Sequence, residues 1–122
     1  MEYGYKDIVQ LNDFSIYANN DKKQYELWFE ELMFYETPQD LINDFFEIRQ
    51  LAKNDIGDCK ISSLETFESN TDTTGILSVE EFVINGHVLY NLHAKSNFKS
   101  NNMYAVFQRF SDELDELAKI YL

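Results

Sequence analysis

The stretch that decides the fold is Ile76–Ala94, ILSVEEFVINGHVLYNLHA, in which two runs rich in β-branched and aromatic residues flank Asn85-Gly86. Asn and Gly tolerate the positive φ of a type I′ turn, so this pair predicts a two-residue β-hairpin. The turn also fixes the register of the two strands. The predicted pairs are Ile84 with His87, Val83 with Val88, Glu81 with Tyr90, Val79 with Leu92 and Leu77 with Ala94.

This register divides the hairpin into two faces. The mostly apolar face carries Leu77, Val79, Val83, Val88, Tyr90, Leu92 and Ala94. The opposite face carries Ser78, Glu80, Asn91 and His93, with Phe82, Leu89, Ile84 and His87 nearer the turn. We expect the apolar face to be buried. Its burial would fix the register, because a slip of one residue would exchange the two faces. Glu81 is the exception on that face, opposite Tyr90.

A second hairpin is predicted upstream, where residues 13–19 alternate between apolar and polar and a polar run, 20–23, follows as the turn. The predicted pairs are Ala18 with Tyr25, Ile16 with Leu27, Phe14 with Phe29, Ser15 with Trp28 and Tyr17 with Glu26. Residues 24–35 also fit helical spacing. We favour a strand because aromatic residues dominate and the preceding run pairs with it. Residues 1–12 fit neither period.

The sequence Thr37-Pro38-Gln39-Asp40 predicts the start of a helix. Thr37 can cap it, Pro38 lacks an N–H that would have no partner in the first turn, and Asp40 approximates a capping box. The apolar stripe that follows comprises Leu41, Ile42, Phe45, Phe46, Ile48 and Ala52. We expect Gly57 to lie just past the end of this helix.

A second amphipathic helix is predicted from residue 103 onward. Its apolar stripe comprises Met103, Val106, Phe107, Phe110, Leu114, Leu117 and Tyr121. Ser111, followed by two acidic residues, could instead restart the helix midway. We assign 59–68 to a strand, although its three-residue apolar spacing also fits a helix, and 95–102 to a loop.

These elements follow the order ββαβββα. We therefore predict a single α+β domain over residues 1–122, with an antiparallel sheet of about five strands and two amphipathic helices packed on one face. No apolar run approaches the roughly 20 residues that span a bilayer. The single cysteine, Cys59, cannot form an internal disulfide, which favours the cytoplasm.

The charge of the chain is strongly acidic. Twenty-two Asp and Glu residues face ten Lys and Arg residues, for a net charge of −12. Such a field repels nucleic acid and anionic membranes and attracts basic partners. We therefore expect a basic protein surface as the partner, with no nucleic acid and no membrane, although acidity also serves solubility.

No catalytic or cofactor site stands out. The two histidines, His87 and His93, lie on one predicted strand about 20 Å apart, too far to share one metal ion. Each could act as a lone general base beside Glu80, but exposed sheet histidines are the commoner case. The four glycines are scattered, which excludes a phosphate-binding loop. We expect no enzyme activity, no cofactor and no metal.

A calcium loop is the closest match to a known ligand motif. Asn70, Asp72, Thr74 and Gly75 fit EF-hand positions one, three, five and six, and Glu81 fits position twelve. Only two carboxylates are available, however, and the Asn85-Gly86 turn argues against the helix that should follow. We favour a loop leading into the hairpin and keep a degenerate calcium module as an alternative.

Acidic residues interleaved with aromatic residues are the candidate partner-binding set. Aromatic rings are enriched in interfaces, and carboxylates pair with Lys and Arg of a basic partner. The alternative is that Trp28 packs beneath a helix and the acids are only solvated. The candidates are Tyr17, Glu26, Trp28, Glu30, Glu31, Glu36, Glu65, Glu68, Asp72, Glu80 and Glu81.

In size, acidity, aromatic content and segments such as YELWFEELMFYE (25–36) and VEEFVINGHVLYNLHA (79–94), the chain resembles the immunity proteins of bacterial polymorphic and contact-dependent toxin systems. The resemblance implies a stoichiometric inhibitor of a cognate toxin domain, commonly a basic nuclease, and leaves the oligomeric state open. It gives no single residue a role. The rival hypotheses are a nucleic-acid mimic that inhibits a defence protein, the calcium module, and an unrecognised enzyme or small-ligand binder.

Overall fold

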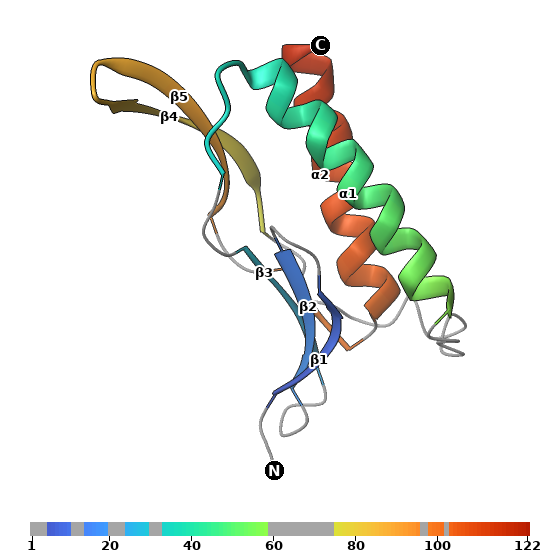
Figure 1. The fold of residues 1–122 in the computed structure, drawn as a ribbon. Coiled ribbons are helices and arrows are strands. Elements are labelled where there is room, and N and C mark those ends of the chain that lie inside the picture. Colours follow the sequence, from blue (N-terminus) through green and yellow to red (C-terminus); the bar gives the residue numbers. More distant parts are fainter. Residues whose placement is uncertain are drawn as a thin grey trace.

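The computed structural model describes residues 5–10, 14–19, 24–29, 33–58, 75–95, 98–101 and 103–122. Its elements are β1 (Tyr5–Gln10), β2 (Phe14–Asn19), β3 (Gln24–Phe29), α1 (Pro38–Asp58), β4 (Leu77–Ile84), β5 (His87–Ala94), β6 (Lys99–Ser100) and α2 (Met103–Tyr121). The predicted α+β class with two helices and antiparallel strands is confirmed (Figure 1). The described strands form two sheets, ordered β1-β2-β3-β6 and β4-β5.

The first sheet is built around the predicted β2–β3 hairpin. Every predicted pair occurs, from Phe14 with Phe29 to Ala18 with Tyr25, so the strand assignment is confirmed for residues 24–29. β1 pairs with β2 across a bulge between Asp7 and Val9. A bulge adds one residue to one strand and breaks its alternation, which accounts for the missing period within residues 5–10.

A short strand, β6, forms the fourth member of this sheet. It pairs with β3, placing Ser100 opposite Tyr25 and Lys99 opposite Glu26. The assignment of 95–102 to a loop is therefore wrong at these two positions. Two residues carry too little pattern to predict a strand, and this pairing depends on β3 offering a free edge. The predicted strand at 59–68 lies outside the described residues.

Helix α1 begins as its sequence predicts. The Asp40 N–H donates a hydrogen bond to Thr37 Oγ1 over 3.0 Å, which is the expected N-terminal cap. The helix runs through Gly57 to Asp58, so the expectation that Gly57 lies past its end is wrong. Glycine lowers helix propensity by only about 1 kcal/mol, and a single unfavourable residue does not end a helix.

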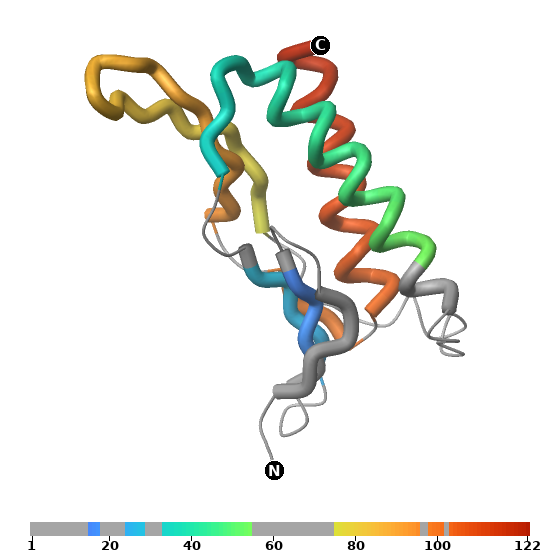
Figure 2. Tube along the Cα trace, in the orientation of Figure 1, coloured from blue at the N-terminus to red at the C-terminus, as the bar shows by residue number. Residues whose placement is uncertain are grey.

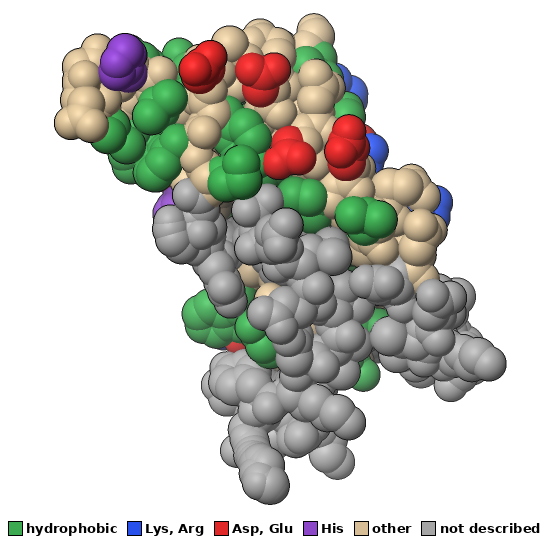
Figure 3. All heavy atoms as spheres, viewed as in Figure 1, with side chains coloured by type: hydrophobic (Ala, Val, Ile, Leu, Met, Phe, Trp, Pro, Cys, Tyr) green, Lys and Arg blue, Asp and Glu red, His purple; other side chains and the backbone are tan. Residues whose placement is uncertain are grey.

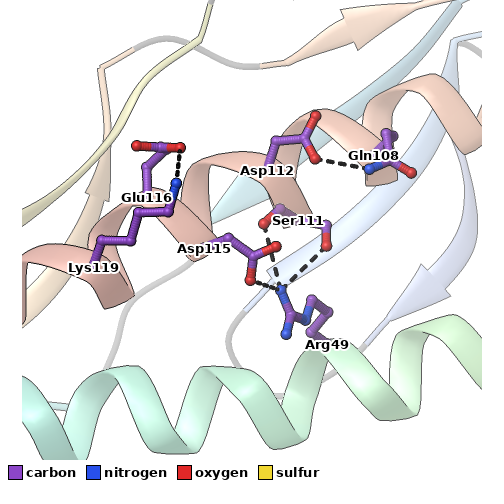
Figure 4. Close-up of polar contacts among 7 residues, drawn as sticks. All are labelled: Arg49, Gln108, Ser111, Asp112, Asp115, Glu116 and Lys119. Atoms are coloured by element: carbon purple, nitrogen blue, oxygen red, sulfur yellow. Dashed lines mark hydrogen bonds and ion pairs between the residues drawn. The ribbon is translucent and has the colours of Figure 1, made fainter. Parts of the chain in front are cut away.

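Helix α2 is one continuous helix of 19 residues, with no restart at Ser111. Ser111 instead joins the two helices: its carbonyl and hydroxyl oxygens both accept hydrogen bonds from Arg49 Nη1, at 3.4 and 3.2 Å (Figure 4). The same nitrogen lies 2.6 Å from Asp115 Oδ1. Arg49 therefore links α1 to α2 at the edge of their interface.

The core lies where the two helices meet the inner faces of the sheets. The helices run side by side in opposite directions (Figure 1). Both predicted helical stripes supply buried residues, and the strands add a few more. The fully buried apolar side chains include Ile16, Leu27, Leu41, Ile42, Ala52, Phe98, Met103, Val106, Phe110 and Leu114.

Candidate functional site

The β4–β5 hairpin forms with the predicted register. All eight pairs from Leu77–Ala94 to Ile84–His87 are present. Asn85 and Gly86 adopt φ values of 51° and 81°, the left-handed conformation that the type I′ turn requires. The sequence of the turn thus determines which side chains share each face.

The apolar face of this hairpin is buried only at its base. Leu77 and Leu92 are 3% and 5% exposed, whereas Val83 is 71% exposed and Val88 43%. The expectation of a face buried along its whole length is therefore wrong near the turn. The end of the hairpin diverges from the two helices (Figures 1 and 2), and Val83 there stays mostly exposed.

Residues 33–36 run beside β5 and tie the hairpin to α1 (Figure 2). Tyr35 and Tyr90 exchange two backbone hydrogen bonds of 2.9 and 2.8 Å, forming an isolated antiparallel bridge. The Tyr35 hydroxyl donates a hydrogen bond to the carboxylate of Asp44 in α1. Phe34 packs edge-on against Phe82, with ring centroids 5.3 Å apart. The projecting hairpin is thus held at its middle.

Large apolar side chains remain exposed on both faces around the end of the hairpin. Phe82 lies on one face and Val83 on the other, since neighbours in a strand alternate. We call this set the apolar tip; it comprises Phe34, Phe82, Val83 and Val88. Clustered exposed apolar surface of this kind is typical of protein-binding sites.

The charge around the apolar tip is of one sign. Residues 33–48 and 75–94 contain no Lys or Arg. Figure 3 shows hydrophobic side chains over the hairpin with Asp and Glu beside them, while Lys and Arg come into view only at the opposite edge. The acidic residues of the two stretches are Glu36, Asp40, Asp44, Glu47, Glu80 and Glu81.

The charges of α2, in contrast, are largely paired. Lys119 contacts Glu116 at 3.1 Å, and Asp115 contacts Arg49 at 2.6 Å (Figure 4). Arg109 contacts Glu113 at 3.3 Å. Among the described residues, no Lys or Arg forms an ion pair with any carboxylate of the two acidic stretches. Within the described part of the chain, the carboxylates of these two stretches are therefore not offset by paired cations, as several of those in α2 are.

An open hollow of about 490 Å³ lies between the hairpin turn and the start of α1. One carboxylate and one imidazole line it, together with aliphatic side chains. The lining residues are Glu36, Ile84, Asn85, His87, Val88 and Leu89.

Three predicted partner-binding residues belong to this end of the molecule. Glu36 lines the hollow, and Glu81 is exposed on β4. Glu80 is partly exposed and lies 3.8 Å from His93 Nε2, the neighbour expected from the register. Glu81 stays exposed on the mostly apolar face because that face is uncovered at its distal half. Glu80 and Glu81 thus lie on opposite faces of β4, and Glu36 lies beside residues 84–89, so the three carboxylates are distributed around the hairpin.

The other described candidates lie on the first sheet. Trp28 is 38% exposed, and its Nε1–H donates a hydrogen bond to Glu26 Oε1 over 3.2 Å. Glu26 is only 2% exposed, so the expectation of a solvated carboxylate there is wrong. Its neighbours on the sheet are Trp28, two residues along β3, and Lys99, opposite it in β6. Tyr17, paired with Glu26, is partly buried.

Five predicted residues lie outside the described part of the chain; they are Glu30, Glu31, Glu65, Glu68 and Asp72. The apolar tip itself was not predicted as a site. Its signal is visible in the sequence, because Phe82, Val83 and Ile84 put apolar side chains on both faces of one strand. A strand that is apolar on both faces is either covered on both or available to a partner.

Among the described residues, no three His, Cys, Asp or Glu side chains gather in a way that could hold a metal ion. Residues 77–84 form strand β4, as the hairpin pattern predicted, where an EF-hand would end its loop and continue as a helix. Residues 70–74 of the calcium-loop match lie outside the described chain. No described helix has the length and apolar character needed to cross a membrane.

Comparison with protein-family models, with curated proteins and with solved structures finds no match to this chain.

Proposed function

We propose that this protein is an immunity protein, a stoichiometric inhibitor that binds a basic, nuclease-type bacterial toxin domain through the β4–β5 hairpin. One observation carries the proposal: a projecting hairpin exposes apolar side chains on both faces, and residues 33–48 and 75–94 contain six carboxylates and no Lys or Arg. An interface of this composition combines an apolar centre with a charged rim, as in tight protein complexes.

The two parts of the surface would act at different stages of binding. Unneutralised carboxylates steer a basic partner toward the hairpin and raise the association rate. Once docked, the apolar tip loses water, and burial of apolar area slows dissociation. The apolar tip also favours a protein partner over nucleic-acid mimicry, since a phosphate mimic needs carboxylates without an exposed hydrophobic centre.

The proposal includes a cytoplasmic location, which suits a chain with the single cysteine Cys59. It assigns no chemistry to the protein itself. Inhibition would follow from occupying the active site of the toxin or a surface beside it.

The test takes a basic toxin domain that the protein binds, sought first among the products of neighbouring genes, and measures the association rate by stopped flow at several salt concentrations. The double reversal E36K/E81K removes charge at the hairpin end. The matched control D112K/E116K makes the same change in net charge at exposed positions of α2. We expect the hairpin variant to associate about tenfold more slowly and the control less than about threefold more slowly, with rates falling as salt rises.

Equal slowing by the two variants would show that net charge matters and the hairpin does not. An association rate that ignores salt and both variants would contradict electrostatic steering altogether. Generic double-stranded DNA can be added as a competitor for a nuclease toxin. DNA should compete with the protein if the protein covers the active site of the toxin, and should not compete if the protein binds a distant surface.

A further inference from the structure

The hollow beside the hairpin turn exists because a strand pairing stops there. Tyr35 pairs with the outer edge of β5 at Tyr90. The chain then leaves that edge at Thr37-Pro38, where α1 begins. Val88 lies two residues before Tyr90, so its N–H and C=O face the same outer edge. In the described chain no backbone hydrogen bond continues the bridge toward Val88.

The lining of the hollow is unevenly charged. Among the described residues, Glu36 is the only carboxylate that lines it, and no described Lys or Arg does. Glu36 is exposed and forms no ion pair with a described Lys or Arg. The positive end of α1 lies close by, but Asp40 in its first turn offsets that partial charge. The hollow therefore favours a cation.

The walls of the hollow specify the shape of that cation. Ile84, Val88 and Leu89 offer aliphatic surface to a hydrocarbon stem. The Glu36 carboxylate and the outward-facing Val88 carbonyl offer acceptors to a head group with several donors. A guanidinium carries five N–H donors in one plane on a three-carbon stem, and it is less strongly hydrated than an ammonium.

We propose that this hollow is an anchor site for one arginine side chain of the protein partner, an inference that rests on the proposed immunity function. The arginine stem packs on the aliphatic wall while its guanidinium meets Glu36 and the edge of β5. A buried arginine near the centre of an interface is a common hot spot. The site thus predicts an exposed arginine on the toxin surface that faces the hairpin.

The test uses a capped tripeptide, acetyl-Ala-Arg-Ala-amide, titrated into the full chain labelled with ¹⁵N. We expect saturable amide shifts confined to residues 36 and 84–89, with a dissociation constant on the order of 10 mM. The same peptide with citrulline in place of arginine keeps the shape and lacks the charge. It should produce no saturable shift, and the lysine peptide should bind at least about threefold more weakly.

Two variants separate the hollow from general attraction to an acidic protein. E36Q removes the carboxylate that lines the hollow, and we expect about fivefold weaker binding of the arginine peptide. E81Q makes the same change of charge at an exposed position of β4 outside the lining set, and should leave binding within about twofold. Unchanged thermal unfolding of E36Q would show that the fold is intact.

Shifts spread over all acidic residues, or equal loss in E36Q and E81Q, would overturn the arginine site. If the peptide fails at the hollow while E36K/E81K still slows toxin association, the anchor is wrong and the proposed function stands. If the peptide binds at the hollow but no toxin domain binds the protein, the immunity function fails and the arginine site remains.

Discussion

The two halves of the β4–β5 hairpin share one pair of strands and one alternation, yet they have opposite surroundings. At the base, Leu77 and Leu92 are buried against the core; near the turn, Val83 and Val88 are exposed. Alternation fixes which side chains share a face, but burial of that face depends on what packs against it. The base of the hairpin is part of the core, and the end is exposed, which is where we propose that a partner binds.

The charges show the same contrast. Around α2 the cations sit beside carboxylates, as with Arg109 and Glu113 or Lys119 and Glu116. Around the hairpin the acidic residues have no basic neighbour in sequence between 33 and 48 or between 75 and 94. Paired charges leave little field outside the protein, and unpaired charges of one sign produce a strong one. Electrostatic steering is thus expected at the hairpin and not at the helices.

The largest expected effect tests the base of the hairpin against its end. Leu92→Ala should lower the free energy of unfolding by about 3 kcal/mol, because it leaves a cavity beside the core. Val83→Ala, in the same hairpin, should change it by less than about 0.5 kcal/mol because the side chain is exposed. Urea unfolding followed by circular dichroism measures both. Similar losses would mean that the end of the hairpin is packed after all.

The turn should give an intermediate effect. Gly86→Ala places a Cβ on a residue with φ of +81°, where no atom lies within 4 Å, so the cost is conformational and not steric. We expect a loss of about 1–2 kcal/mol in unfolding free energy. Asn85→Gly, at φ of 51°, is the control and should stay within a few tenths of a kcal/mol, about the size of ordinary surface substitutions. Equal effects would contradict a turn held by its left-handed residues.

The smallest expected effect concerns the paired charges of the helices. Arg49→Met removes two hydrogen bonds to Ser111 and the contact with Asp115, and should cost about 1 kcal/mol of stability. Lys119→Met removes only an exposed pair with Glu116 and should cost less than about 0.3 kcal/mol. Thermal unfolding at low and high salt measures both. If Lys119→Met lowered stability as much as Arg49→Met, the contact between the helices would contribute no more than an exposed ion pair.

Local chemistry made much of the fold predictable. Asn85-Gly86 gave the full register of one hairpin, and the polar run after Asn19 gave that of the other. Thr37 capped α1 as expected. The predictions from sequence failed where the local structure depends on pairing with another segment of the chain. β6 pairs with β3 over more than seventy residues, and the bulge in β1 cannot be seen in a simple period.

The candidate site was predictable in its charge and less so in its geometry. Glu36, Glu80 and Glu81 were all expected from sequence, but Glu26 was expected to be exposed and is buried beneath its neighbours in β3 and β6. A sequence shows that a residue faces the polar side of a strand. It does not show whether another strand lies alongside.

The sequence by itself determined which side chains share each face of the hairpin, and it determined the excess of acidic charge, because turn chemistry and composition are local properties. Only the tertiary structure decided that the end of the hairpin diverges from the helices, that residue 36 lies beside residues 84–89, and that a hollow forms between them. Those features depend on where α1 begins relative to the edge of β5, and that distance is set by packing between segments far apart in the chain.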